Sequence, residues 1–250
     1  MVQEPNDRSF YDTAGSMNGW DFSRVRCTAD AQGVDLYREA AGVLGQRSLV
    51  LDIGTGGGEA LLNFADQARL AVGIDQSPAM IETAISNGAR CREKPVRFLQ
   101  MDAGSLHFPD GFFDMITCRH SPFSASEAQR VLAPGGVFLT QQVGERDKSN
   151  LKAFFGRGQH EGAEEGTLMR RYVQELQEAG FSRVECTESD VTETYERYED
   201  LLFLLTHTPI IPGFGECGHD LARLDAFVEE YGTAQGIRTN ASRFLIKALK

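Results

Sequence analysis

The sequence predicts an α/β protein built on a doubly wound, mostly parallel sheet that is covered by helices on both faces. Short apolar runs alternate with helical patterns from residue 48 to 142, which is typical of successive strand–helix units. A glycine-rich turn follows the first apolar run. The apolar fraction of 41% and charged fraction of 24% are those of a globular chain with a buried core, so disordered and collagen-like proteins are excluded.

Five apolar runs are short enough to be buried strands of a parallel sheet. In chain order they are Ser48–Ile53, Leu70–Ile74, Val96–Met101, Phe113–Cys118 and Val137–Gln141. The gaps between them are long enough for helices, so each pair of neighbouring runs indicates one crossover unit.

Helical signals fill these gaps. The first predicted helix starts at about Glu59, with one apolar side formed by Leu61, Leu62, Ala65 and Ala68. The second has Ser77 as its N-cap and Pro78 at its first position. Its predicted inward residues are Ile81, Ala84 and Ile85. A later helix carries the capping-box pattern of Ser124 and Glu127 and ends before Pro134.

The pattern changes after residue 143. A helix with inward positions Leu168, Tyr172, Leu176 and Ala179 is predicted to end at Gly180. Alternating residues then predict two strands, one through Val184 and Cys186 and a last one through Phe244, Ile246 and Ala248. Between them, an insertion over residues 195–240 contains two helical patterns, at Leu201–Thr206 and Leu221–Tyr231.

We expect a single domain over residues 1–250 with three parts. Residues 1–47 are predicted to form a helical or irregular N-terminal cap that contains Phe10, Tyr11, Trp20 and Phe22. Residues 48–142 are the predicted core, and residues 143–250 add helices, the last strands and the insertion.

The charge of the chain makes nucleic acid an unlikely partner. The formal net charge is −11, which would repel phosphate backbones unless basic residues cluster. Residues 161–200 hold twelve acidic and four basic residues, so this segment carries −8 of the total. Such a run usually forms a solvated face, although it could also attract a cationic partner.

Cysteine usage and hydropathy predict a cytoplasmic protein with no membrane span. The five cysteines include no CxxC pair, and no histidine stands at zinc-finger spacing, so reduced thiols and no metal site are expected. The N-terminus is polar and acidic, and the strongly apolar run Leu201–Leu205 is far too short to cross a bilayer.

The glycine turn and a later acid together indicate an adenosine-containing ligand. The turn reads Asp52-x-Gly54-x-Gly56-x-Gly58, and glycines between a strand and a helix let a ligand lie against the backbone. Asp75 stands 19 residues after Gly56, at the end of the next strand, where a carboxylate can accept both hydroxyls of a ribose. A dinucleotide fingerprint would need glycine or alanine at position 59, which is Glu59.

From about Ser48 to Thr140 the chain resembles the class I S-adenosylmethionine-dependent methyltransferases, in particular their UbiE-like, type-11 subgroup. The motifs that carry the resemblance follow one another in order. They are Asp52–Gly58, Asp75–Gln76, Phe98–Ala103, Phe113–Cys118 and Arg130–Phe138.

The resemblance implies a seven-stranded sheet whose antiparallel last strand, Arg243–Leu249, inserts beside the fifth. It also implies S-adenosylmethionine as cofactor, with Asp52 near the methionine amino group, Asp75 on the ribose and Asp102 on the adenine amino group. The expected cofactor-binding residues are Asp52, Gly54, Thr55, Gly56, Gly58, Asp75, Gln76, Met101, Asp102, Ala103 and Arg119. S-adenosylhomocysteine would be the product.

Methyl transfer is an in-line displacement, so positioning is the main task and a general base is needed only for some acceptors. His120 follows the fourth core strand and is the candidate base, against a structural role. Arg119 could contact the cofactor or an acidic substrate, or simply pack at a strand end. His207 lies in the insertion, where a structural role at a helix end is the favoured interpretation.

The predicted function is methyl transfer to an oxygen, nitrogen or carbon atom of a small-molecule acceptor, because caps and insertions build closed pockets. A tRNA or rRNA methyltransferase is the first competing hypothesis. Its basic surface would use Arg24, Arg26, Arg90, Arg92, Lys94 and Arg97. The segment after the fourth strand, Arg119–Phe123, lacks the Pro-Pro-aromatic motif of many nucleobase amine methylases. The chain could also be a non-catalytic protein that binds the cofactor or, if Glu59 is tolerated at the third glycine position, a dehydrogenase.

Overall fold

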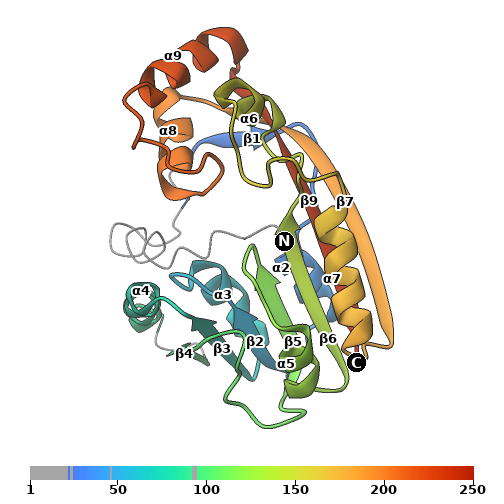
Figure 1. Ribbon diagram of the computed structural model, residues 1–250. Helices are drawn as coiled ribbons and strands as arrows, with labels where there is room; N and C mark the ends of the chain where they lie inside the picture. Colours follow the sequence, from blue (N-terminus) through green and yellow to red (C-terminus); the bar gives the residue numbers. More distant parts are fainter. Residues whose placement is uncertain (1–21, 23–24, 46, 92–94) are drawn as a thin grey trace.

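The computed structural model describes residue 22 and residues 25–45, 47–91 and 95–250. Phe10, Tyr11 and Trp20 of the predicted cap therefore lie outside the described residues, as do Arg24, Arg92 and Lys94. Figure 1 shows an α/β core with α6, α8 and α9 gathered beyond one end of it. No helix in the described part of the chain is long and apolar enough to cross a membrane.

A nine-stranded mixed sheet runs through the described residues in the order β1-β7-β9-β6-β5-β2-β3-β4, with β8 paired to β9. The strands are β1 (Cys27–Ala29), β2 (Leu49–Ile53), β3 (Leu70–Asp75), β4 (Val96–Gln100), β5 (Phe113–Arg119), β6 (Leu132–Val143), β7 (Arg183–Tyr195), β8 (Gly232–Thr233) and β9 (Gly236–Leu249). The five strands from β2 to β6 pair in parallel. The predicted insertion of the last strand is confirmed, because β9 pairs antiparallel with both β6 and β7.

Two apolar clusters on opposite faces make the sheet doubly wound. One face is covered by α5 (Ala125–Val131) and α7 (Thr167–Glu178), whose buried residues include Ala128 and Leu176. The other face is covered by α2 (Leu36–Val43), α3 (Glu59–Phe64) and the 3₁₀ turn η1 (Ala65–Gln67). The helix α4 (Pro78–Ala89) packs against β3 and β4, with Ser77 Oγ accepting from Met80 N as an N-cap.

A third apolar cluster belongs to the insertion and its neighbours. It joins α6 (Ser149–Phe155), α8 (Tyr198–His207) and α9 (Asp220–Tyr231). The same cluster contains Tyr195 of β7 and Ile237 of β9, where these strands extend past the parallel core. This arrangement places the insertion beyond the end of β6, as Figure 1 shows.

The predicted N-terminal cap is not purely helical in its described part. β1 pairs antiparallel with the last three residues of β7, because β7 extends past the core and leaves an edge there that another strand can use. α2 lies on the sheet rather than over an opening, since Leu36 and Ala40 are fully buried in the cluster with α3. The short strands β1 and β8 account for the two strands beyond the predicted seven.

Two local predictions need correction. Ile85 was expected to face inward but is 54% exposed, because α4 packs through Met80, Ile81 and Ala84 and brings Gly88 against Phe98. The capping box is only half formed, since Ser124 Oγ accepts from Glu127 N while the Glu127 carboxylate accepts from Leu106 N instead of Ser124 N.

Candidate functional site

The glycine turn between β2 and α3 has a backbone that only glycine adopts readily. Gly54, Gly56 and Gly58 have φ angles of +70°, +57° and +77°. Gly54 N and Thr55 N both donate to Ile74 O at 2.9 Å, which holds the turn against the end of β3. A Cβ on Gly54 would lie 2.3 Å from the Ser121 side chain. The turn is therefore packed tightly between β3 and the segment that follows β5.

Asp52 lies buried beneath this turn, with 1% of its surface exposed. Its Oδ1 accepts from Thr117 Oγ1 at 2.7 Å and from the Tyr37 hydroxyl at 3.5 Å. Oδ2 and the buried hydroxyl of Thr55 have no partner within hydrogen-bond distance among the described residues, although the Thr55 hydroxyl is close enough to Asp52 to lower its pKa. Burial raises the pKa of Asp52 to about 6, and the hydrogen bond from Thr117 opposes that rise. An unpartnered carboxylate oxygen in this position costs stability unless a ligand supplies a donor.

We expect Asp52→Asn to flatten the dependence of stability on pH in the ligand-free protein. The folded-state pKa of about 6 is above the ordinary 3.8, so the folded protein holds this proton between those values and the unfolded chain does not. Wild-type stability should therefore fall as pH rises from about 4 to about 6, and the asparagine variant should lose that part of the slope. Urea unfolding across this range measures it, and an unchanged slope would contradict the assignment of a raised pKa.

Asp75 stands at the end of β3 and faces the same turn. Its Oδ2 accepts from Gly56 N at 3.0 Å, and its Oδ1 accepts from Ser77 N at 2.9 Å. A carboxylate that accepts from two backbone donors has a fixed orientation. Met101 N donates to Asp75 O, so the end of β4 is tied to the same place.

The remaining predicted cofactor residues lie along the same edge of the sheet. Gln76 follows β3, and Met101, Asp102 and Ala103 follow β4. Asp102 is exposed, and its Oδ1 accepts from Gly104 N at 2.7 Å. The side chain of Thr55 is buried and lies over the backbone of Gly73 in β3.

Arg119 and His120 end β5 at this edge. His120 has a left-handed backbone with φ of +53°, and its N donates to Gln141 O at 2.9 Å. The residue is exposed to solvent. The surrounding protein, and then the charges of Arg243, Arg119 and Lys148, lower the pKa of His120 well below 6.5. The imidazole is therefore neutral at pH 7, and a strained residue at a strand end is a frequent feature of functional sites.

A pocket of about 360 Å³ opens beside Arg119. It is lined by Gln32, Gly33, Val34, Asp35, Arg119 and Gln141. The Gln141 side chain accepts from Leu36 N at 2.9 Å, and the Arg119 guanidinium lies 5.9 Å from the centre of the Tyr37 ring. Tyr37 and Gln141 were not predicted as site residues, because only the packing of α2 on the sheet brings them there. In the sequence, Gln141 could have been recognised as a candidate site residue because it is a polar residue at a buried strand position.

His207 has the structural role that the sequence favoured. It is the last residue of α8, is buried, and stacks on Phe203 with ring centres 3.9 Å apart. Its Nδ1 is 2.8 Å from Phe203 O.

Comparison with known proteins gives consistent matches. A protein family described as "Methyltransferase domain" matches residues 50–136. The uncharacterized methyltransferase YcgJ of Bacillus subtilis is 40% identical over 97 residues, which are 36% of this chain and 38% of YcgJ. The demethylmenaquinone methyltransferase of Thermus thermophilus is 40% identical over 96 residues, 35% of this chain and 43% of that protein. These aligned segments span about two fifths of the curated relatives' length.

Structural similarity covers more of the chain than these sequence alignments do. The crystal structure of YcgJ superimposes with a TM-score of 0.57 at 21% identity, covering 86% of this chain and 97% of YcgJ. The Rossmann-like sheet is therefore shared over most of both chains.

The residues at the glycine turn fit S-adenosylmethionine. The buried carboxylate oxygen Asp52 Oδ2 lacks a partner within hydrogen-bond distance in the part of the chain that the structure describes. Three glycines of the turn have left-handed backbones, and two of them, Gly54 and Gly58, lie against the side chains of Ser121 and Phe98. An amino group beside Asp52 and a ribose beside Asp75 would satisfy carboxylates that are already oriented.

Proposed function

We propose that the protein is a class I S-adenosylmethionine-dependent methyltransferase that transfers a methyl group from this cofactor to a small-molecule acceptor, on the basis of the match of residues 50–136 to a methyltransferase domain. The acceptor atom is an oxygen, nitrogen or carbon. The observation that carries the proposal is the pair of oriented carboxylates, Asp52 and Asp75, on either side of a glycine turn at the carboxyl edge of a parallel sheet.

In this proposal, different residues at the carboxyl edge of the sheet bind different parts of the cofactor. Asp52 faces the methionine amino group, Asp75 and Gln76 hold the ribose, and Met101, Asp102 and Ala103 enclose the adenine. Gly54, Thr55, Gly56 and Gly58 form the turn beneath it, and Arg119 lies toward the methionine end beside Tyr37. When bound, S-adenosylmethionine supplies a methyl group on a sulfonium, which is an electrophile. The protein's contribution is to align the acceptor with it.

His120 is the proposed base for acceptors that must lose a proton. Its lowered pKa keeps the imidazole neutral at pH 7, so it can accept a proton from a hydroxyl or activated carbon. The left-handed backbone fixes the start of the side chain at the end of β5.

We expect His120→Asn to lower kcat by about a hundredfold, the usual contribution of a general base, with a smaller change in KM. Asparagine tolerates the left-handed conformation, so the backbone should keep its path. Steady-state kinetics and the affinity for S-adenosylhomocysteine are the measurements. A variant with full kcat would show that His120 is structural.

A small-molecule acceptor is supported by the charge of the chain and by the relatives. The demethylmenaquinone methyltransferase of Thermus thermophilus has a small-molecule acceptor by its name. The acidic segment 161–200 covers α7, β7 and the start of α8, which disfavours an RNA footprint there. An RNA methyltransferase would use a basic surface that includes Arg26. Arg26 Nη1 lies 3.5 Å from Glu196 Oε2, so this arginine is paired with an acid. A cytoplasmic location and the single-domain organisation stay predictions.

Incubation of the protein with methyl-labelled S-adenosylmethionine and a fractionated metabolite extract, with and without RNA, tests the proposal. Label is expected in a low-molecular-weight fraction without RNA. Label in RNA would establish a tRNA or rRNA methyltransferase, and cofactor binding without label in any fraction would favour a non-catalytic binding protein. Binding of a nicotinamide cofactor instead of S-adenosylmethionine would overturn the assignment.

A further inference from the structure

Arg243 extends the candidate site onto the last strand. It lies in β9, paired with Val143 of β6 on one side and Ser189 of β7 on the other. Side chains alternate along a strand, so Arg243 shares a face with Leu245, which packs in the cluster of α2 and α3. Arg119 shares this face as well, because it alternates with Met115 of the same cluster.

The pairing register places the two arginines at the same end of the sheet, two strands apart. Arg119 pairs with Gln141, and Gln141 pairs with Leu245, so two strand spacings, or about 10 Å, separate Arg119 from β9. Arg243 is two residues further along β9, on the side beyond the end of the core strands. His120 directly follows Arg119, its N donates to Gln141 O, and the charges of Arg243 and Arg119 both lower its pKa.

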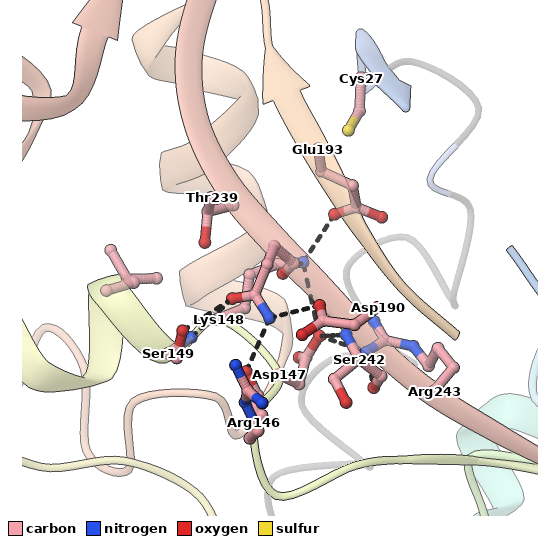
Figure 2. A network of polar contacts seen from close by, with 12 residues as sticks. Cys27, Arg146, Asp147, Lys148, Ser149, Asp190, Glu193, Thr239, Ser242 and Arg243 are labelled. Carbon is pink, nitrogen blue, oxygen red and sulfur yellow. Dashed lines mark hydrogen bonds and ion pairs between the residues drawn. The ribbon is translucent and has the colours of Figure 1, made fainter. Parts of the chain in front are cut away.

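A buried network holds Arg243 in one orientation (Figure 2). Its Nη1 donates to Asp147 Oδ1 and to Ser242 O. Asp147 also accepts from Ser242 N and lies 3.6 Å from Lys148 Nζ. Lys148, with 1% of its side chain exposed, donates to Glu193 Oε2 at 2.6 Å and to Asn240 O at 2.9 Å. Each buried charge therefore has an opposite partner.

One edge of the Arg243 guanidinium is left open. No described residue accepts a hydrogen bond from its Nε or Nη2, and 18% of the side chain is exposed. Nε and Nη2 are the two parallel donors that bind a carboxylate or phosphate side-on. Burying four charges costs desolvation free energy, so such a network is poor as a stabilising device and suits the orientation of a binding group.

We propose that Arg243 binds an anionic group of the methyl acceptor, a carboxylate or a phosphate, and holds the acceptor beside His120. The inference rests on the proposed function and adds the chemical class of the acceptor to it. Arg119, beside Asp52 and Tyr37, lies over the strands that carry the cofactor turn, whereas Arg243 is two strands away. The two arginines thus serve different ligands, with the cofactor's own carboxylate nearer to Arg119.

The test uses the full chain saturated with S-adenosylhomocysteine, so that the cofactor's carboxylate position is already filled. Acetate, benzoate and inorganic phosphate are titrated in turn by calorimetry and thermal denaturation. We expect wild type to bind either the carboxylates or phosphate, which distinguishes the two sources of the anion. Arg243→Gln should bind that anion about tenfold more weakly or worse, with unchanged affinity for S-adenosylhomocysteine.

Arg238→Gln is the matched control, because Arg238 lies on the same strand but is exposed and outside the network. It should bind the anion as wild type does.

Arg243→Gln could fail to fold because Asp147 loses its partner. In that case anion binding is measured with Arg243→Lys instead. Lysine keeps the charge opposite Asp147 but lacks the side-on pair of donors, so anion binding should again weaken while the fold persists.

Anion binding that is unchanged in Arg243→Lys or in a folded Arg243→Gln would overturn the proposal, as would absence of anion binding to the wild-type complex. Loss of S-adenosylhomocysteine affinity in Arg243→Gln would assign the residue to the cofactor and also overturn it. If wild type does not bind S-adenosylhomocysteine at all, the proposed function itself fails, and this inference with it.

Discussion

Replacing Asp75 by alanine is expected to weaken the binding of S-adenosylhomocysteine by about a hundredfold or more while the protein stays folded. Hydrogen bonds to a charged group contribute roughly 1.5–3 kcal/mol each, and the variant loses those to two ribose hydroxyls. It also loses the contact from Asp75 Oδ2 to Gly56 N, which orients the glycine turn. Isothermal titration calorimetry measures the affinity, and circular dichroism confirms the fold.

Glu82→Ala is the control for that measurement. Glu82 is an exposed acid on α4, the helix that follows β3, so its removal changes the net charge equally near the site. Its affinity for S-adenosylhomocysteine should equal that of wild type. Equal affinities for all three proteins would show that Asp75 does not hold the ribose.

The second large effect is expected from Gly54→Ala. The residue has a φ of +70°, where an L-residue costs roughly 1–2 kcal/mol, and its new Cβ would lie 2.3 Å from Ser121 Cβ and Oγ. Overpacking adds roughly 1–3 kcal/mol, so the free energy of unfolding should fall by both amounts. Because the turn must move away from Ser121, binding of S-adenosylhomocysteine should be lost as well. Urea unfolding and calorimetry measure the two effects.

Two further variants separate the conformational cost of the positive φ from the collision with Ser121. Gly156 has a similar φ of +64° but nothing within 4 Å of the added Cβ, so Gly156→Ala should show only the conformational cost. Adding Ser121→Gly to Gly54→Ala removes the colliding side chain and should restore part of both the stability and the binding. A double variant no better than Gly54→Ala would mean that Ser121 does not constrain the turn.

The elements that the sequence predicted well carry their signals locally. Strands β2 to β5 lie within about a residue of the predicted runs, because apolar runs and turn glycines report burial and chain reversal directly. The helix α4 begins at Pro78 behind the Ser77 cap as expected. The prediction for Ile85 was wrong because several apolar residues on one helix allow two neighbouring faces, and only the position of Phe98 in β4 selects between them.

The lengths of the last parallel strand and of the antiparallel strands were underestimated for a related reason. β9 begins at Gly236 rather than near Arg243, and β6 begins at Leu132 before the Pro134 turn. Polar residues in these extensions hide the strand pattern, because they pair with each other along β7 and β9 rather than with an apolar core.

The sequence by itself determined where the proposed cofactor-binding residues lie. Asp52, the three glycines and Asp75 stand at strand ends, and the carboxyl ends of neighbouring parallel strands necessarily meet at one edge. Tertiary structure alone decided where the other residues of the site lie. Tyr37 reaches Asp52 through the packing of α2, and Arg243 reaches the neighbourhood of Arg119 through an antiparallel strand more than a hundred residues later in the chain. Such contacts depend on which strand edge pairs with which, and that choice is made by burial across the whole sheet rather than by any local run of residues.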